Sequence, residues 1–281
     1  MGWIPDVPSI RDYTASHPTV APLAAKTRLT ATPAAPLPPK VDLRPHFPAI
    51  WDQQELGACT AHAAAALVAY FEKKAMGRPV DISRLFLYKT TRNLTGATGD
   101  TGAYLRTTME ALAVFGAPPE SYWPYDGSAA VDNRRFDVEP TAFCYAFARS
   151  FTALKYLRLD PVGATPDQAL ANIRHHLAAG FPSIFGFPAY DEYMNAGADG
   201  KIFYPAPSSQ LYGGHANAAA GYDDHLTIGS DTGALLVRNS WGTSWGQQGY
   251  GWLPYKYVTQ RLAADWWTVI QQSWVDTGQF A

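Results

Sequence analysis

The sequence is short of cysteine, of net charge and of long apolar runs. Its 281 residues include two cysteines, Cys59 and Cys144, so neither a disulfide scaffold nor a four-thiolate zinc site can form. Charged residues make up 16% of the chain and the net charge is −2, which provides no basic surface for nucleic acid. No apolar run approaches the roughly 20 residues of a membrane-spanning helix. Hydrophobic residues at 47% exclude a disordered chain. We therefore expect one large domain or two smaller ones, with no nucleic-acid or membrane partner.

Residues 1–40 differ in composition from the rest of the chain. They contain eight prolines and no helical or strand period, which predicts an extended arm ahead of a folded domain at 41–281. No basic stretch followed by an apolar run opens the chain, so we expect no signal peptide and a protein that is cytoplasmic by default or exported by a non-classical route. Apolar residues near the start of the arm are candidates for docking on a surface: Trp3, Ile4, Val7, Ile10 and Tyr13.

After Val41 the pattern becomes that of packed helices and strands. An alanine-rich run predicts a helix over 59–76 that Gly77 ends, and further helices are expected at about 103–115 and 166–179. Helices in the first half and strands in the second predict an α+β fold. We expect a helical lobe at about 50–150 and a β-rich lobe at about 151–270, with a cleft where the lobes meet. Runs typical of strands occur at 183–187, 215–222, 234–241, 249–255 and 266–270.

Cys59 lies at the start of the first predicted helix, after a turn that contains Gly57. The unpaired backbone N–H groups and the positive dipole end of a helix N-terminus both favour a thiolate over a thiol. A structural cysteine would be expected in mid-helix, on the apolar face. The position of Cys59 therefore favours a reactive nucleophile.

A thiolate nucleophile needs a base that also protonates the leaving group, and the base needs a group to orient it. His215 follows two glycines and opens a strand-like run, and Asn239 ends another such run 24 residues later. An amide can hold an imidazole without adding charge, and Trp241 could keep water away from that contact. Gln53 precedes Cys59 by six residues, where its amide could join the Cys59 backbone N–H in binding an oxyanion.

Three segments carry these residues, and together they resemble the active-site blocks of the papain-like cysteine peptidases. The segments read VDLRPHFPAIWDQQELGACTAHA, YGGHANAAAGYDD and LLVRNSWGTSWGQQGYGWLPY. The resemblance covers about residues 41–270 and implies a two-lobed fold that acts on peptides or proteins with no cofactor. It implies that Cys59 is the nucleophile, His215 the general base and then acid, Asn239 the group that orients His215, and Gln53 part of the oxyanion hole. In this family the thiol acts as a thiolate.

The same resemblance suggests where a substrate would bind. Small residues opposite Tyr104 and Leu105 imply an open apolar pocket, and hence an apolar side chain two residues before the scissile bond. Trp245 is expected on the other side of that bond. The residues implied in substrate binding are Gly102, Ala103, Tyr104, Leu105, Gly186, Ala216 and Trp245.

The sequence also departs from the family pattern. Leu56 stands where most members have a disulfide cysteine, Gln54 replaces a glycine and Thr60 replaces an aromatic residue, a combination typical of a disulfide-poor, bacterial-looking branch. Where the family has a long helical propeptide, residues 1–40 show no helical period. We expect instead that either residues 3–13 or the proline-rich stretch of this arm lies in or over the cleft and restrains activity.

Other residues have simpler interpretations. Cys144 is expected to be a buried thiol that packs as a small hydrophobe. Cys59 and His62 resemble half of a zinc site, but no second pair of ligands stands near them in sequence, so we expect no metal and a His62 that packs within its helix.

Three functions are compatible with these residues. Hydrolysis by a cysteine endopeptidase is favoured. A transpeptidase or amidase that acts on a specialised peptide would use the same nucleophile, and product analysis with added amines would distinguish it. A catalytically silent binding module is disfavoured because all four catalytic positions hold competent residues.

Overall fold

The long helix α2 (Cys59–Met76) lies at the centre of the molecule. The computed structural model describes residues 1–281 except 30–35, 129–134, 150–151 and 153. Most of α2 from Cys59 to Phe71 is buried, and its alanines allow it to pack closely against the sheet. The helix ends as predicted at Gly77, which adopts the left-handed conformation with φ of 77° and bonds its N–H to the carbonyl of Lys73.

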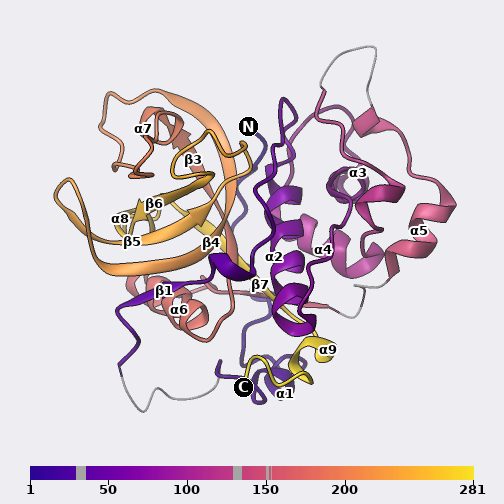
Figure 1. Ribbon diagram of the computed structural model, residues 1–281, viewed down its shortest axis with the longest axis horizontal. Helices are drawn as coiled ribbons and strands as arrows, with labels where there is room; N and C mark the ends of the chain where they lie inside the picture. The colour runs from indigo at the N-terminus through magenta and orange to yellow at the C-terminus, as the bar shows by residue number, and fades with distance from the viewer. Residues whose placement is uncertain (30–35, 129–134, 150–151, 153) are drawn as a thin grey trace.

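Three further helices surround α2 on one side (Figure 1). Helix α4 (Leu105–Phe115) was predicted, with a start two residues earlier. Helices α3 (Arg84–Thr95) and α5 (Ala142–Ala148) were not predicted. The side chains of Ser83 and Thr141 cap their first turns by accepting backbone N–H groups. This half of the molecule contains the expected helical region.

An antiparallel sheet forms the other half. Its strand order is β2-β7-β3-β4-β5-β6, and β1 pairs with the long strand β4. One edge of β4 pairs with β3 through Ala219 and with β1 from Gly221 onward, so β4 curves through the whole sheet (Figure 1). The strands are β1 (Lys40–Asp42), β2 (Lys155–Arg158), β3 (Ser183–Tyr190), β4 (Leu211–Ile228), β5 (Asp231–Arg238), β6 (Tyr250–Pro254) and β7 (Ala264–Ile270).

The remaining helices lie beside the sheet and near the ends of the chain. Helix α6 (Pro166–Ala178), the longest of them, carries a complete capping box between Thr165 and Gln168. Helix α9 returns to the helical half, where Trp274 stacks on Phe71 with ring centroids 4.9 Å apart. The other helices of this group have four residues each and are α1 (Ala21–Ala24), α7 (Asp191–Met194), α8 (Lys256–Thr259) and α9 (Gln272–Val275), with 3-10 turns at Arg44–His46, Glu120–Tyr122 and Arg135–Asp137.

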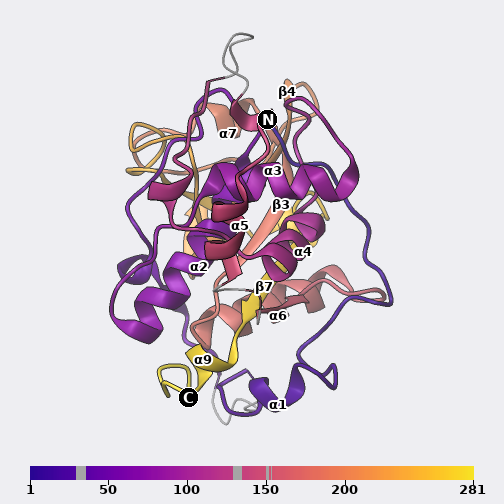
Figure 2. The same ribbon diagram turned by 90° about the vertical axis from the view of Figure 1, so that its right-hand side faces the viewer.

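The described part of the N-terminal arm is packed against the body of the molecule. Figure 2 shows it running from the upper end of the molecule down one side to α1, beside the C-terminus. There Val20 is fully buried and the N–H of Arg28 bonds to the carbonyl of Phe280. Part of the predicted extended stretch, residues 30–35, lies outside the described residues. Residues 21–24 are helical instead of extended, because Pro22 suits the first turn of a helix.

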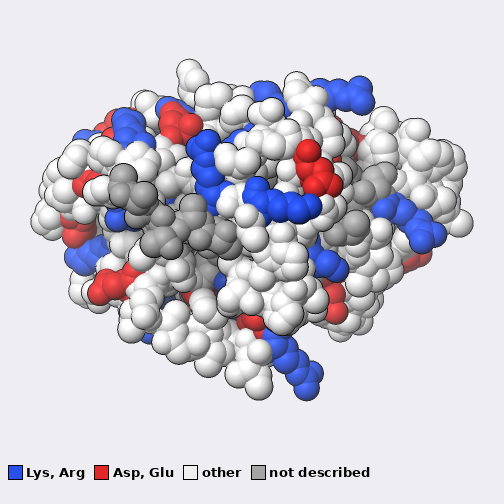
Figure 3. All heavy atoms as spheres, turned by 90° about the horizontal axis from the view of Figure 1, so that it is seen from below, with Lys and Arg blue, Asp and Glu red and all other residues white. Residues whose placement is uncertain are grey.

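Both cysteines are buried and free. Figure 3 shows basic and acidic side chains interspersed on the face seen from below. Within the described residues, no helix is both long enough and apolar enough to cross a membrane.

Candidate active site

Cys59 is the first residue of α2, and a hydrogen-bond network fixes the turn that precedes it. The backbone N–H of Gly57 donates to both carboxylate oxygens of Asp100, at 2.9 and 3.0 Å. The hydroxyl of Tyr88 donates to the same carboxylate at 2.5 Å and accepts the backbone N–H of Gly102 at 3.1 Å. The turn before the nucleophile and the segment around Gly102 are therefore both tied to the carboxylate of Asp100. Neither Tyr88 nor Asp100 stands in a segment that the sequence marks as functional.

Adjacent strands bring His215 and Asn239 together. His215 lies on β4 and Asn239 directly follows β5, which pairs with β4. The Nε2–H of His215 donates to Oδ1 of Asn239 at 2.8 Å. Trp241 covers this contact, with its ring 4.5 Å from the imidazole. The imidazole is thereby fixed, and its Nδ1 lies outside this contact.

Further aromatic rings enclose the imidazole. Tyr193 contacts His215, Trp241 and Trp245, with ring centroids 5.5, 5.3 and 4.8 Å away respectively. The indole N–H of Trp245 donates to the backbone carbonyl of Tyr193 at 3.0 Å. Trp245 thus belongs to the aromatic wall beside His215, whereas Gly186 lies at a separate pocket described below. Tyr193 was not recognised from the sequence.

Gln53 is buried, and its side-chain amide is fixed at both ends. Its Oε1 accepts the hydroxyl of Ser240 at 2.6 Å, and its Nε2 donates to the carbonyl of Leu56 at 2.8 Å. Its backbone N–H also donates to the carbonyl of Ser240 at 2.7 Å. Gln53 therefore links the turn before Cys59 to the residue that follows Asn239.

Burial keeps the thiol and the imidazole neutral. It raises the pKa of Cys59 to about 11, although hydrogen bonds from the backbone of Ala216, Gly2 and Thr60 oppose the rise. Burial also lowers the pKa of His215 to about 3, despite its bond to Asn239. The Nδ1 of His215 makes no hydrogen bond to any described residue. The favourable helix terminus at Cys59 is therefore outweighed by the loss of solvent.

The first residues of the N-terminal arm lie between the two halves of the site. The N–H of Ala103 donates to the carbonyl of Gly2 at 2.6 Å, and the N–H of Ile4 donates to the carbonyl of Ala103 at 3.0 Å. The N–H of Trp3 donates to the carbonyl of Gly214 at 3.1 Å, on the opposite side. Trp3 pairs with Ala103 in the parallel sense.

The indole of Trp3 fills a pocket in the wall of the cleft. A Cβ at Gly186 would collide with the indole, so the missing side chain provides the room. At the base of the pocket, Oδ2 of Asp265 accepts the indole N–H of Trp3 at 3.1 Å. Oδ1 of Asp265 accepts the indole N–H of Trp267 at 2.7 Å and lies 3.3 Å from Nη1 of Arg158. Burial raises the pKa of Asp265 to about 6.

Asp265 was not identified from the sequence, which suggested a purely apolar pocket. Its φ of 62° places the backbone in the left-handed region, which Asp tolerates better than most residues. Its partners Trp3 and Arg158 are distant in the chain, so no local pattern indicates the contact.

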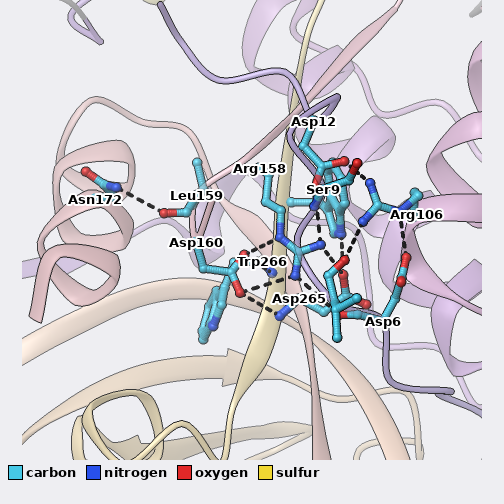
Figure 4. Close-up of polar contacts among 12 residues, drawn as sticks. Asp6, Ser9, Asp12, Arg106, Arg158, Leu159, Asp160, Asn172, Asp265 and Trp266 are labelled. Atoms are coloured by element: carbon cyan, nitrogen blue, oxygen red, sulfur yellow. Dashed lines mark hydrogen bonds and ion pairs between the residues drawn. The ribbon is translucent and has the colours of Figure 1, made fainter. Parts of the chain in front are cut away.

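Ion pairs hold the next part of the arm (Figure 4). Arg106 pairs with both Asp6 and Asp12. The buried guanidinium of Arg158 lies 3.6 Å from Asp12 and 2.9 Å from Asp160, and its backbone N–H donates to the carbonyl of Tyr13. Removing one partner of a buried ion pair is costly, because it leaves an uncompensated charge in the interior.

The remaining predicted binding residues lie around the same pocket and cleft. Gly102 and Ala103 follow the Tyr88–Asp100 network, and Tyr104 directly precedes α4, whose first residue Leu105 is fully buried. Ala216 is buried next to His215 and its backbone hydrogen-bonds to the thiol of Cys59. The structure thus brings together Cys59, His215, Asn239 and Gln53.

A buried thiol at a helix start beside an amide-oriented imidazole defines a cysteine–histidine hydrolase site. The sequence matches the family model described as "Papain family cysteine protease" over residues 37–263. The chain belongs to the papain family of cysteine proteases, and it is therefore a hydrolase that acts on peptides or proteins.

Relatives in two other comparisons agree with this assignment. The chain is 34% identical over 224 residues to an uncharacterised peptidase C1-like protein of Acanthamoeba polyphaga mimivirus, covering 78% of this chain and 68% of the relative. It is similar to the crystal structure of xylellain, a cysteine protease from Xylella fastidiosa, with 32% identity, a TM-score of 0.78 and coverage of 96% and 95% of the two chains. Bromelain from Ananas comosus shares the fold, with 18% identity, a TM-score of 0.57 and coverage of 84% and 100%.

Proposed function

We propose that Cys59, His215, Asn239 and Gln53 hydrolyse peptide bonds through a thioester intermediate. The Cys59 thiolate attacks the carbonyl carbon, and the amide of Gln53 with the Cys59 N–H stabilises the oxyanion. His215 protonates the leaving amine as the C–N bond breaks, then takes a proton from the water that attacks the thioester and releases the acid. The observation that best supports these roles is the 2.8 Å bond from His215 Nε2 to Asn239 Oδ1, which leaves Nδ1 for the nucleophile.

Cys59→Ala is expected to abolish peptide hydrolysis, because no other group can form the thioester. Hydrolysis of a fluorogenic peptide would be measured together with circular dichroism. Cys144→Ala is the matched control, since Cys144 is also buried and free but lies in α5. Turnover by a folded Cys59→Ala variant would refute the assignment.

We also propose that the arm of residues 1–40 restrains the protease domain at 41–281. A substrate residue in the Trp3 pocket precedes the scissile bond, so a substrate chain runs from the pocket toward the thiol. The arm runs from Gly2 at the thiol to Trp3 in the pocket, which is the opposite direction. It therefore fills the cleft without presenting a bond for cleavage.

Two kinds of contact support this restraint. The backbone of residues 2–4 uses hydrogen-bonding groups of Ala103 and Gly214 that a substrate backbone would need. The charged contacts of Arg106 and Arg158 with Asp6 and Asp12 anchor the chain beyond the pocket (Figure 4). Because the seated arm also excludes water from the thiol and imidazole, the thiolate–imidazolium pair is disfavoured until the arm leaves.

Trp3→Ala is expected to raise the rate of peptide hydrolysis about tenfold to a hundredfold. This increase in rate is expected because the seated arm loses the roughly 1.5–3 kcal/mol gained by burying a large apolar side chain. The comparison is with Ile10→Ala, which removes an apolar arm residue that is 90% exposed. If the Trp3→Ala arm exchanges its amide hydrogens freely but turnover does not rise, the restraint is contradicted.

The pocket supports a preference for an apolar side chain two residues before the scissile bond. Gly186 and Ala216 leave its wall small, and the indole of Trp3 shows that an aromatic ring fits. The carboxylate at its base is paired with Arg158, so the pocket carries no uncompensated charge for a cationic side chain. Asp265 Oδ2 can still accept one neutral N–H or O–H from a substrate.

We expect the Trp3→Ala variant to cleave a peptide library at bonds that have Trp, Tyr, Phe or Leu two residues before the scissile bond. Lys and Arg should be disfavoured there, because Arg158 repels a second cation. The profile of a further Asp265→Asn variant serves as the control and should lose preference for Trp and Tyr relative to Phe. A dominant preference for Arg or Lys would contradict the proposal.

A further inference from the structure

A small internal cavity lies behind Asn239, between α2 and the strands β4 and β5. It has a volume of about 10 Å³, close to the smallest cavity that holds one water molecule. Most of its wall is apolar, but two lining residues, His62 and Asn239, carry buried polar atoms that hydrogen-bond to no described residue. These atoms are Nε2 of His62 and Nδ2 of Asn239.

The hydrogen bonds of Asn239 identify its unpaired atom as a donor. Oδ1 accepts the backbone N–H of Ser240 at 2.8 Å, and a backbone N–H can only donate. The same oxygen accepts from Nε2 of His215. The other end of the amide is therefore the NH₂ group, and leaving it unpaired in the interior would be costly.

The unpaired atom of His62 is an acceptor. Its Nδ1 lies 3.0 Å from the carbonyl of Ala58, which can only accept, so Nδ1 carries the proton. Burial lowers the pKa of His62 to about 3, so the ring is neutral and Nε2 keeps its lone pair. Edge contacts with Tyr125 and Trp51, with ring centroids 4.6 and 6.5 Å away, fix the ring.

We propose that His62 is a positioning residue that holds Asn239 through one water molecule in this cavity. The water accepts a hydrogen bond from Nδ2 of Asn239 and donates one to Nε2 of His62. A buried water bound by complementary polar groups is part of a protein structure and is costly to remove. This inference rests on the proposed role of Asn239 in orienting His215.

The bridge adds a restraint on the Asn239 amide, whose Oδ1 already accepts the N–H groups of Ser240 and His215. With Nδ2 anchored on the cavity side, Oδ1 stays directed at His215. Without the acceptor on His62, Nδ2 loses its partner and the amide can rotate toward other geometries. The imidazole would then be aligned less often with the thiol, which reduces kcat more than it affects substrate binding.

His176 provides a matched control for His62. It too is buried, its Nδ1 lies 2.7 Å from the carbonyl of Asn172 four residues earlier, and its Nε2 has no partner among the described residues. Burial lowers its pKa to about 4. It lies on α6, which supplies none of the proposed catalytic residues.

The test compares His62→Phe, His176→Phe, Asn239→Ala and the His62→Phe/Asn239→Ala double variant of the full chain. We expect His62→Phe to lower kcat for a peptide about tenfold with little change in KM, as the loss of one hydrogen bond would. His176→Phe should leave kcat within about twofold of the parent chain, and His62→Phe should cause no further loss in the Asn239→Ala chain.

The possible outcomes separate this inference from the proposed function. If Asn239→Ala keeps full activity, the assignment of Asn239 itself fails. If Asn239→Ala lowers kcat but His62→Phe does not, or if their effects add, His62 does not act through Asn239. Should His62→Phe not fold, a high-resolution crystal structure of the unaltered chain decides. A water within hydrogen-bond distance of both atoms supports the inference, and an empty cavity overturns it.

Discussion

The exclusion of water from Cys59 and His215 is the constraint on which the rest of this structure depends. A cysteine–histidine pair reacts as thiolate and imidazolium, and solvent or fixed dipoles must stabilise both charges. In this molecule both groups are fully buried, with pKa values of about 11 and 3. The start of α2 and the amide of Asn239 provide favourable dipoles, but these do not compensate for the loss of water.

The burial comes from residues that are far from the site in sequence. Trp3 fits a pocket that exists because Gly186 has no side chain, and its indole N–H finds a carboxylate that Trp267 and Arg158 already hold. Asp6 and Asp12 then bind the arginines that flank the pocket. Under the proposed restraint, the backbone groups of Ala103 and Gly214 bind either the arm or a substrate, one at a time.

Features of the fold and the site that depend on residues close together in the chain could be predicted from the sequence. Helix α2 and its end at Gly77 were predicted because alanine periodicity and a left-handed glycine are local signals. Cys59, His215 and Asn239 were selected as candidate site residues because each stands in a distinctive short segment. Their meeting in space follows from the pairing of β4 and β5 and from the packing of α2 on β4.

Features that depend on contacts between distant parts of the chain could not be predicted from the sequence. The run that forms α3 (Arg84–Thr95) mixes polar and apolar residues, and Ser83 gives it an N-cap that was overlooked. In the sequence, Asp265 is a polar residue next to tryptophans with no distinctive pattern. Its role depends on its contacts with Trp3 and Arg158, which are distant in the chain. The direction of the arm and the polar cavity shared by His62 and Asn239 likewise have no local signature. Both features depend on how the helical half and the sheet half of the molecule pack together.

The ionisation of Cys59 in the full chain tests the account most directly. In a Cys144→Ala background, Cys59 is the one remaining thiol, and the ultraviolet absorbance of its thiolate can be followed against pH while hydrogen exchange at Trp3 and Ile4 reports whether the arm is seated. Because burial raises the pKa, the thiol should stay protonated through neutral pH and titrate at about 11. A seated arm with Cys59 titrating at or below the ordinary value of about 8.5 would contradict the account.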